Sequence, residues 1–544
     1  MALAQSIYAS HRTVNLSGLK PPLIRRLQSV RVEHVLLIAI LVVGIALRLF
    51  RLNHQSLWLD EIGEGSVAST PFPRFFSEVR YGAGAAPLDY LAVKFMLALF
   101  GHGTTATRLW AFLCGSLVIF LTYRVGLEFF KSAAVGLIAA FMVSVSAFLI
   151  FYAQEARFYS LAALLGLLNL WAFNRAFTRD RRIDWIIFGL VVALGLYGHY
   201  FLAALVATEG VFLVAYWLWL AARAHWARTT MRRAAGQVGR FLAASIAGIV
   251  VFVPWLLFAA GGTLNWGWPP PPPLDLARMH QIAVVLLALA PLNSTPSWNP
   301  VAWARTDVVL ILAVLGLAVA LVRGRAQVLL LAITPPLMVV LAWRADQVAH
   351  YFWGERQVIA ALPLLYLLAA SGVAYVGALL WRVAGDQGLN LRYNRSRVIA
   401  GVLIGVLAIG WVGFNAGPIR RVYAGTWNVK EDWRGAATLI RTQACPDSHF
   451  YSFLDEHSSY GFAWYAPSLT SRTDSIFRAG KSGDLLEAVR RVGFGPHDWM
   501  VVTIPSAVQD EGGTTVDAVL GGEGWTYRDF SGIRAYYRQP TCGH

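Results

Sequence analysis

Long apolar runs separated by short polar segments dominate residues 1–417 of the chain. Most of these runs approach the length of about 20 apolar residues that a helix needs to cross a bilayer. The runs assigned to spans cover residues 35–50, 108–127, 133–151, 161–177, 185–197, 201–220, 241–258, 308–322, 328–343, 358–378 and 398–414. This pattern predicts an all-α polytopic membrane protein with about 11 transmembrane helices.

Two further apolar runs are too short to cross a membrane. Residues 87–100 include the charged side chains of Asp89 and Lys94, and residues 282–290 form an even shorter run. Short apolar helices that carry charges favour the membrane surface over its interior. We therefore expect two surface helices, the first of them within a long outer loop at residues 51–107.

Basic residues predict how the spans are oriented. Residues 1–34 are polar and basic, so we interpret them as a cytosolic tail, and the loops predicted on the same side are also rich in arginine. The predicted outer loops carry arginines as well, among them Arg157 and Arg356. The orientation rule does not explain these arginines, whereas binding of an anionic lipid head group would.

The composition changes after Gly417. Residues 418–544 are mixed, polar and aromatic, and their length suits one small domain. Apolar patterns predict helices at 431–442 and 484–492, a strand at 499–504 and a hairpin at 525–538. An odd number of spans precedes this α/β domain, so we expect it outside the cytosol. The chain would thus consist of the tail, a transmembrane domain at 35–417 and a periplasmic domain at 418–544.

Composition agrees with a membrane protein and narrows the chemistry. The chain is 57% hydrophobic and 14% charged, and its mean hydropathy is +0.53, more apolar than a soluble protein of 544 residues would be. The net charge of +16 indicates nucleic-acid binding only weakly, because most basic residues lie in short loops between apolar runs. The three cysteines show no paired metal-binding spacing.

Two of the cysteines bracket most of the C-terminal domain. Cys445 and Cys542 could form a disulfide in an oxidising compartment, and two unpaired thiols are the alternative. Cys114 lies inside a predicted span, where packing explains it.

Four polar clusters are predicted at the outer ends of spans. They are Asp60 and Glu61; Tyr152, Gln154, Glu155, Arg157 and Tyr159; His199 and Tyr200; and His350, Tyr351, Glu355 and Arg356. Each cluster also has an ordinary structural explanation. In the order given, these are a solvated carboxylate pair, ion pairs at the membrane face, a hydrogen-bonded pair at the interface, and an arginine that extends to the interface. Together they provide carboxylates to accept a proton and guanidinium groups to neutralise a leaving phosphate, as transfer from a lipid phosphate requires.

At these clusters the sequence resembles the GT-C membrane glycosyltransferases of family 39. The resemblance is strongest to the branch of dolichyl-phosphate-mannose–protein mannosyltransferases and the lipid A aminoarabinose transferase. It is carried by Gln55-Ser56-Leu57-Trp58-Leu59-Asp60-Glu61, Tyr152-Ala153-Gln154-Glu155-Ala156-Arg157-Phe158-Tyr159, Gly198-His199-Tyr200-Phe201, Glu355-Arg356-Gln357 and Asp432-Trp433-Arg434-Gly435-Ala436-Ala437. No glycine-rich phosphate loop is present, so soluble nucleotide chemistry is not indicated.

The resemblance implies a polyprenyl-phosphate sugar as donor, without a nucleotide, a cofactor or an essential metal. Asp60 would be the general base of an inverting transfer, and Glu61 would orient the acceptor or hold the local charge. Arg356 and Arg157 would bind the donor phosphate. The substrate cavity would be lined by Tyr152, Gln154, Glu155, Tyr159, His199, Tyr200, His350, Tyr351 and Glu355. The implied location is the outer face of a bacterial inner membrane, and the acceptor, whether lipid, glycan or protein, stays open.

The chain departs from its relatives at two points near the site. After Asp60-Glu61, relatives often have an aromatic residue, where this chain has Ile62-Gly63-Glu64-Gly65. Many relatives have a His-Pro-Pro-Leu or Lys-Pro run where this chain has Ala85-Ala86-Pro87-Leu88-Asp89, so a basic group is missing there.

Two other classes of protein would also explain many spans with outer arginines. A polyprenyl-lipid transporter or flippase is one alternative, although we see no internal repeats and most charged groups cluster at the ends of spans. A purely structural membrane protein is the other. Glu155, His199 and Asp60 could also meet around a cation, but we predict no essential metal.

Overall fold

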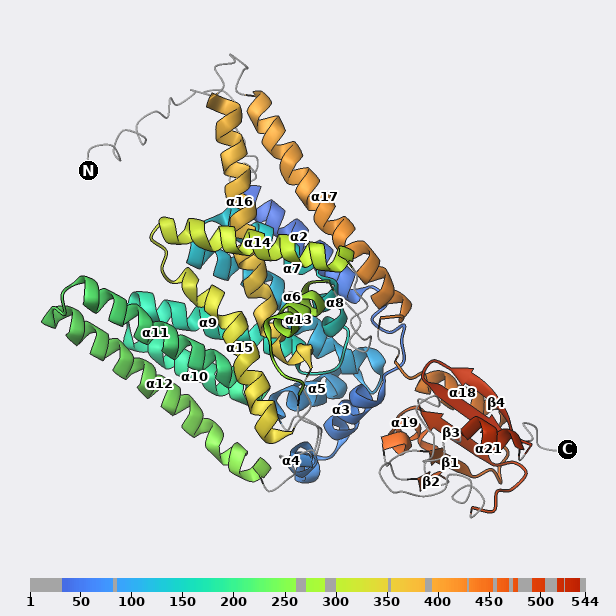
Figure 1. Cartoon of the computed structure of the whole chain (residues 1–544). Helices are drawn as coiled ribbons and strands as arrows, with labels where there is room; N and C mark the ends of the chain where they lie inside the picture. The colour runs from blue at the N-terminus through green and yellow to red at the C-terminus, as the bar shows by residue number, and fades with distance from the viewer. Residues whose placement is uncertain are drawn as a thin grey trace, which may run out of the picture.

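The computed structural model of the protein describes residues 32–81, 86–260, 271–288, 300–350, 354–386, 394–427, 430–453, 457–468, 473–477, 492–503, 516–522 and 524–538. A large bundle of helices makes up most of the molecule, and a small domain with a sheet lies at one end of it (Figure 1). The predicted fold class is therefore confirmed.

The helices of the bundle follow the predicted spans closely. They are α2 (Val32–Leu49), α6 (Thr104–Phe130), α7 (Ala133–Ser144) with α8 (Ala147–Ala153), α9 (Tyr159–Arg179), α10 (Arg182–Gly198), η1 (Tyr200–Leu202) with α11 (Ala203–Arg223), α12 (Arg228–Ala260), α14 (Pro300–Val322), α15 (Val328–Ala349), η2 (Glu355–Ala361) with α16 (Leu362–Asp386), and α17 (Asn394–Ala424). Among the described residues, eight helices are long and apolar enough to cross a membrane, or nine if the bent pair α7–α8 crosses as one. Helices α10 and α17 occupy the two other predicted spans, so the number 11 stays a prediction.

The span predicted at 133–151 is broken in the structure, because α7 and α8 meet at a bend of 63°. The fully buried guanidinium of Arg48 donates to the carbonyls of Val143 (3.1 Å) and Ser144 (3.0 Å), which the end of α7 leaves without helical partners. The side chain of Asn415 accepts the first N–H of α8, from Ala147, at 3.2 Å. These polar groups satisfy the backbone at the break, and so the bend is tolerated inside the bundle.

The first outer loop contains three helices, where the sequence predicts one. The helix predicted at 87–100 is present as α5 (Pro87–Phe100), preceded by α3 (Leu59–Ser69) and α4 (Phe72–Tyr81), and its place on the membrane surface stays a prediction. The ammonium of Lys94 donates to the carbonyls of Ala68 (3.1 Å) and Thr70 (2.5 Å), so α5 holds the C-terminal end of α3. The second predicted surface helix is α13 (Leu276–Ala288), which begins six residues earlier than expected.

The small domain is built on a five-stranded sheet in the order β2-β1-β3-β5-β4. Its strands are β1 (Phe450–Phe453), β2 (Thr473–Phe477), β3 (Trp499–Thr503), β4 (Thr526–Phe530) and β5 (Ile533–Tyr537), and its described helices are α18 (Trp433–Gln443), α19 (His457–Tyr465) and α21 (Val516–Gly522). Strand β1 runs parallel to β2 and β3, whereas β5 pairs antiparallel with β3 and β4. The predicted first helix, strand and hairpin are confirmed, and the predicted helix at 484–492 falls on residues of which all but the last lie outside the described part.

The small domain shares its apolar core with the first outer loop. Leu57 and Ile62, at the start of α3, are fully buried in one cluster with Trp433 and Phe462. The hydroxyl of Tyr465 also accepts the backbone N–H of Leu57 at 2.7 Å. The segment that carries Asp60 and Glu61 is therefore packed between the bundle and the small domain.

Candidate functional site

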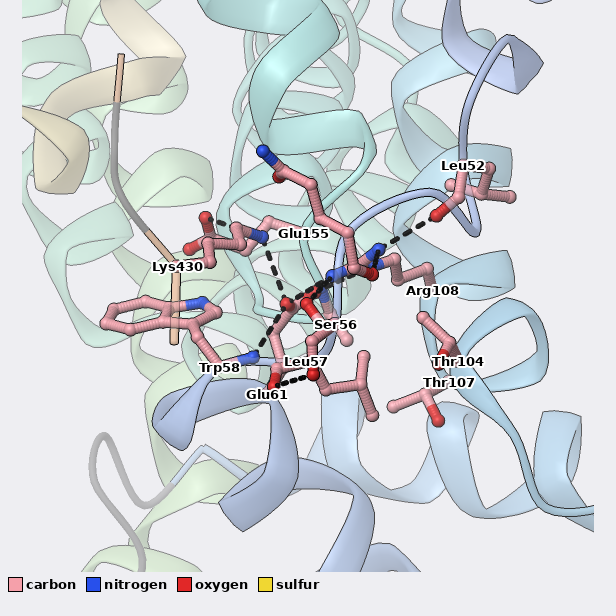
Figure 2. A network of polar contacts seen from close by, with 12 residues as sticks. Leu52, Ser56, Leu57, Trp58, Glu61, Thr104, Thr107, Arg108, Glu155 and Lys430 are labelled. Carbon is pink, nitrogen blue, oxygen red and sulfur yellow. Dashed lines mark hydrogen bonds and ion pairs between the residues drawn. The ribbon is translucent and has the colours of Figure 1, made fainter. Parts of the chain in front are cut away.

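Glu61 lies at the centre of a buried polar network (Figure 2). Arg108 from α6 binds both of its carboxylate oxygens, with Nε 2.7 Å from Oε1 and Nη2 2.6 Å from Oε2. Lys430 donates to Oε2 at 3.0 Å, and the backbone N–H of Ala156 donates to Oε1 at 2.9 Å. Burial alone would raise the pKa of Glu61, but the two cations outweigh it and lower that pKa to about 2.

Arg108 also holds the chain that leads to the acidic pair. Its Nη1 donates to the carbonyls of Leu52 (2.8 Å) and Gln55 (3.0 Å), and its Nη2 donates to that of Ser56 (2.9 Å). One guanidinium thereby fixes both the turn after α2 and the Glu61 side chain. The sequence analysis assigns no role to Arg108, because an arginine at the start of a span is also typical of orientation signals.

Asp60 has a different environment from its neighbour. Successive side chains on a helix point in directions about 100° apart, and here Glu61 is fully buried while the Asp60 side chain is 31% exposed. The nearest ion-pair partner of Asp60 among the described residues is Arg157, with Nε 3.9 Å from Oδ2. This carboxylate is therefore available to a ligand that enters the site.

Arg157 lies between Asp60 and a second acidic pair that the sequence analysis missed. Its Nη1 is 3.2 Å from Oε2 of Glu64, which is fully buried. Asp89 of α5 is also buried and interacts with Glu64. Burial and the charge of Asp89 raise the pKa of Glu64, and burial raises the pKa of Asp89 to about 7. The spacing of three residues between Glu61 and Glu64 predicts that they lie on one face of a helix. It does not predict which arginine pairs with Glu64.

The opposite wall of the site contains Glu155, Arg356 and two tyrosines. Glu155 is 1% exposed, and its only ion-pair partner in the described part of the chain is Lys430, at 3.6 Å from Oε2. Burial raises the pKa of Glu155, and the charges of Lys430 and Arg356 oppose that rise. The guanidinium of Arg356 lies 5.4 Å from the centre of the Tyr159 ring, which packs edge-on against Tyr152 at 4.9 Å.

The remaining predicted cavity residues form contacts within the protein. Gln154 donates to the carbonyls of Arg48 and Phe50 at the end of α2. Tyr200 packs on Phe252, Glu355 pairs with Arg278 of α13 at 3.4 Å, and His350 ends α15 with a positive φ of 49°. Tyr351 lies outside the described residues.

His199 is held neutral by its surroundings. The N–H of Phe201 donates to its Nδ1 at 3.2 Å, so Nε2 carries the proton and donates to Gln357 at 3.0 Å. Burial lowers the pKa of His199 to about 4. Both ring nitrogens are therefore occupied, and neither is free to bind a cation in this arrangement.

The part of the chain that the structure describes contains one group of three residues close enough to hold a metal ion, Cys445, Asp447 and His497. Cys445 is disulfide-bonded, however, and so it is not available as a thiolate ligand. Its predicted partner Cys542 lies outside the described residues, and Cys114 is a free cysteine. Within the described part of the chain, Asp60, Glu155 and His199 do not lie close enough together to hold a metal ion.

Two comparisons with known proteins find a relationship. Residues 85–258 match the family model described as "Dolichyl-phosphate-mannose-protein mannosyltransferase". The fold matches the crystal structures of ArnT from Cupriavidus metallidurans, bound to undecaprenyl phosphate (13% identity) and in the apo state (12% identity). Each match has a TM-score of 0.53 and covers 92% of this chain and 97% of that one. No curated protein sequence matches the chain.

Proposed function

We propose that this chain, which has the GT-C fold and a central segment matching the mannosyltransferases of family 39, is a membrane glycosyltransferase. Its donor would be a sugar linked to polyprenyl phosphate, and its acceptor a hydroxyl group. The family match over residues 85–258 and the fold of ArnT support this class of enzyme. The ArnT structure with bound undecaprenyl phosphate supports the nature of the lipid carrier.

The observation that carries the proposal is the contrast between Asp60 and Glu61. The carboxylate of Glu61 is fully buried and neutralised by Arg108 and Lys430, whereas that of Asp60 is partly exposed beside Arg157. A general base must reach the proton that it removes and must have room to hold it. Asp60 satisfies this condition, and Glu61 would have to break a buried ion pair to do so.

In the proposed reaction Asp60 accepts the proton of the acceptor hydroxyl. The hydroxyl oxygen forms a bond to the anomeric carbon of the donor sugar, and the bond from that carbon to the phosphate oxygen breaks. The electron pair stays on the departing polyprenyl phosphate, whose charge Arg157 and Arg356 stabilise. Attack on the face opposite the leaving phosphate inverts the anomeric configuration.

The site would face the periplasm of a bacterial cell. Disulfides persist in oxidising compartments, and the disulfide-bonded Cys445 belongs to the small domain that packs on α3. The first outer loop, which contains α3, and this domain would therefore both lie on the outer face of the inner membrane. A lipid, a glycan or a protein could supply the acceptor hydroxyl there.

The first test is transfer of labelled sugar in membranes that contain the intact protein or Asp60→Asn. Loss of a general base typically costs about 10²–10⁴-fold in rate, so label should leave the polyprenyl carrier at least about 100-fold more slowly in the variant. Asp447→Asn changes an exposed carboxylate of the small domain and should leave transfer unchanged. If label crosses the bilayer equally well with the intact protein and with Asp60→Asn, without leaving its carrier, the flippase alternative holds instead.

A further inference from the structure

Lys430 enters the site from the segment that precedes the small domain. It is 5% exposed, and its ammonium lies 3.0 Å from Glu61 Oε2 and 3.6 Å from Glu155 Oε2. Figure 2 shows it on the side of Glu61 opposite Arg108. The ammonium is also close to the Phe151 ring, with Nζ 5.3 Å from the ring centre. No motif in the sequence marks Lys430 for this position.

The charges around Lys430 indicate which carboxylate depends on it. Glu61 already has a full counter-charge, because Arg108 binds both of its oxygens. Glu155 has neither oxygen hydrogen-bonded within the described residues, although the side chain is almost fully buried. Two buried carboxylates thus share two buried cations, and Lys430 is the one that contacts Glu155.

The small domain sets the position of Lys430. The next residue, Glu431, accepts the backbone N–H of Leu59 at 3.3 Å, and the N–H of Asp432 donates to Ser531 at 2.8 Å. Trp433 then begins α18 in the buried core of the domain. These contacts follow directly after Lys430 in the sequence, so the seating of the small domain on α3 helps to place its ammonium beside Glu155.

We propose that Lys430 is a positioning residue of the transferase site, which neutralises Glu155 and holds that carboxylate ready to accept hydrogen bonds from a hydroxyl-bearing substrate. The inference rests on the proposed function and deepens it, because it makes the small domain part of the active centre. Neither oxygen of the buried Glu155 side chain has a hydrogen-bond donor among the described residues, and the hydroxyl groups of a sugar or of an acceptor are the chemical class that would supply them.

Other titratable groups also face Glu155, and each would remain in a Lys430 variant. They are Asp60 and Glu61 from α3, Arg108 from α6, Tyr152 from α8 and Arg356 from η2. Without Lys430 the remaining cations are Arg108, which Glu61 engages, and Arg356. Removal of Lys430 is therefore expected to raise the pKa of Glu155, so that less of the carboxylate is ionised at neutral pH.

The test compares the pH dependence of transfer in the intact protein, Lys430→Met and Lys430→Arg. We expect kcat/KM of Lys430→Met to fall at least about tenfold relative to the intact protein at neutral pH, and this loss should shrink as pH rises from neutral to alkaline values and Glu155 ionises. Lys430→Arg keeps the charge and should retain most of the activity across this range. Arg441→Met removes an exposed cation from α18 and is the matched control for the charge of the small domain.

A second pair of variants separates positioning from folding. In a Glu155→Gln background, Lys430→Met should cause no further loss, because residue 155 then has no charge to neutralise and Arg108 still binds both oxygens of Glu61. Parallel pH profiles for Lys430→Met and the intact protein, or an undiminished Lys430 effect in the Gln background, would overturn the inference. Absence of transfer by the intact protein would instead overturn the proposed function.

Discussion

Adjacent residues in this protein have opposite environments. Asp60 and Glu61 form one acidic pair in the sequence, yet the side chain of Asp60 is 31% exposed and that of Glu61 is fully buried. Glu61 depends on Arg108 and Lys430, which lie 47 and 369 positions away. Local patterns cannot identify such partners, because only the packed helices and the small domain bring the charges together.

A second consequence at the residue scale concerns the stability of the buried pair Glu64 and Asp89. Burial raises the pKa of Asp89 from 3.8 to about 7. The folded state therefore keeps its proton up to about neutral pH, whereas the unfolded chain releases it above about pH 4. The stabilising contribution is complete below the unfolded pKa and is lost as pH rises through the folded pKa.

Asp89→Asn should remove this pH dependence, because an amide of nearly the same shape does not ionise. We expect the variant to gain stability relative to the intact protein between pH 5 and 8, by about 1–3 kcal/mol. Thermal unfolding in detergent across this pH range measures the effect, with Asp447→Asn as the exposed control. Stability curves of Asp89→Asn and the intact protein that stay parallel would contradict the raised pKa.

At the scale of helices, close contacts depend on residues that hydropathy does not distinguish. The apolar run at 133–151 predicts one span, because the residues that stabilise the break, Arg48 and Asn415, lie outside that segment.

The crossing of α14 and α16 also depends on a residue that hydropathy does not single out. A Cβ added at Gly372 would lie 2.1 Å from the carbonyl oxygen of Leu312, so the two backbones approach closely only because Gly372 has no side chain.

Gly372→Ala should therefore force α14 and α16 apart and destabilise the bundle. Overpacking of this kind costs about 1–3 kcal/mol, and the loss should be seen as a lower unfolding temperature in detergent. Gly413→Ala is the matched control on α17, where an added Cβ meets no atom within 4 Å. That control should be neutral or stabilising by up to about 1 kcal/mol. Equal effects of the two substitutions would contradict the close crossing.

At the scale of the whole molecule, the bundle and the small domain are joined through α3. Leu57 and Ile62 belong to the apolar core of the small domain, and Arg434 of α18 donates to Thr104 of α6 at 2.9 Å. The domain boundary predicted at 417 falls within α17, which continues to Ala424, and Trp427 still belongs to the apolar core of the bundle.

Leu57→Ala should weaken both parts of the molecule at once. Deletion of a buried leucine side chain costs about 2–5 kcal/mol, and here the cavity would lie in the shared core. We expect faster proteolysis of the small domain and a lower unfolding temperature of the whole protein. Leu99→Ala, at a position on α5 that is 58% exposed, should change neither. Increased proteolysis without a change in the unfolding temperature would show that the two parts unfold independently.

Helices, strands and turns that depend on local composition can be predicted from the amino-acid sequence alone. Apolar length predicts the helices of the bundle and the surface helix α5, because a bilayer demands a run of apolar residues wherever the chain crosses. A short apolar run predicts β3, and turn residues predict the β4–β5 hairpin. Short motifs also single out Asp60, Glu155, Arg157 and Arg356 as candidates, because these residues lie at the ends of apolar runs.

The packing of the helices and of the small domain sets which charged side chains of the site are paired with one another. Arg108, Lys430, Glu64 and Asp89 escaped the sequence analysis, although they surround the predicted base and its arginine. The pKa of a buried group depends on counter-charges within a few ångströms, whatever their separation along the chain. Helix packing and the seating of the small domain set those distances, and no pattern within one segment contains them.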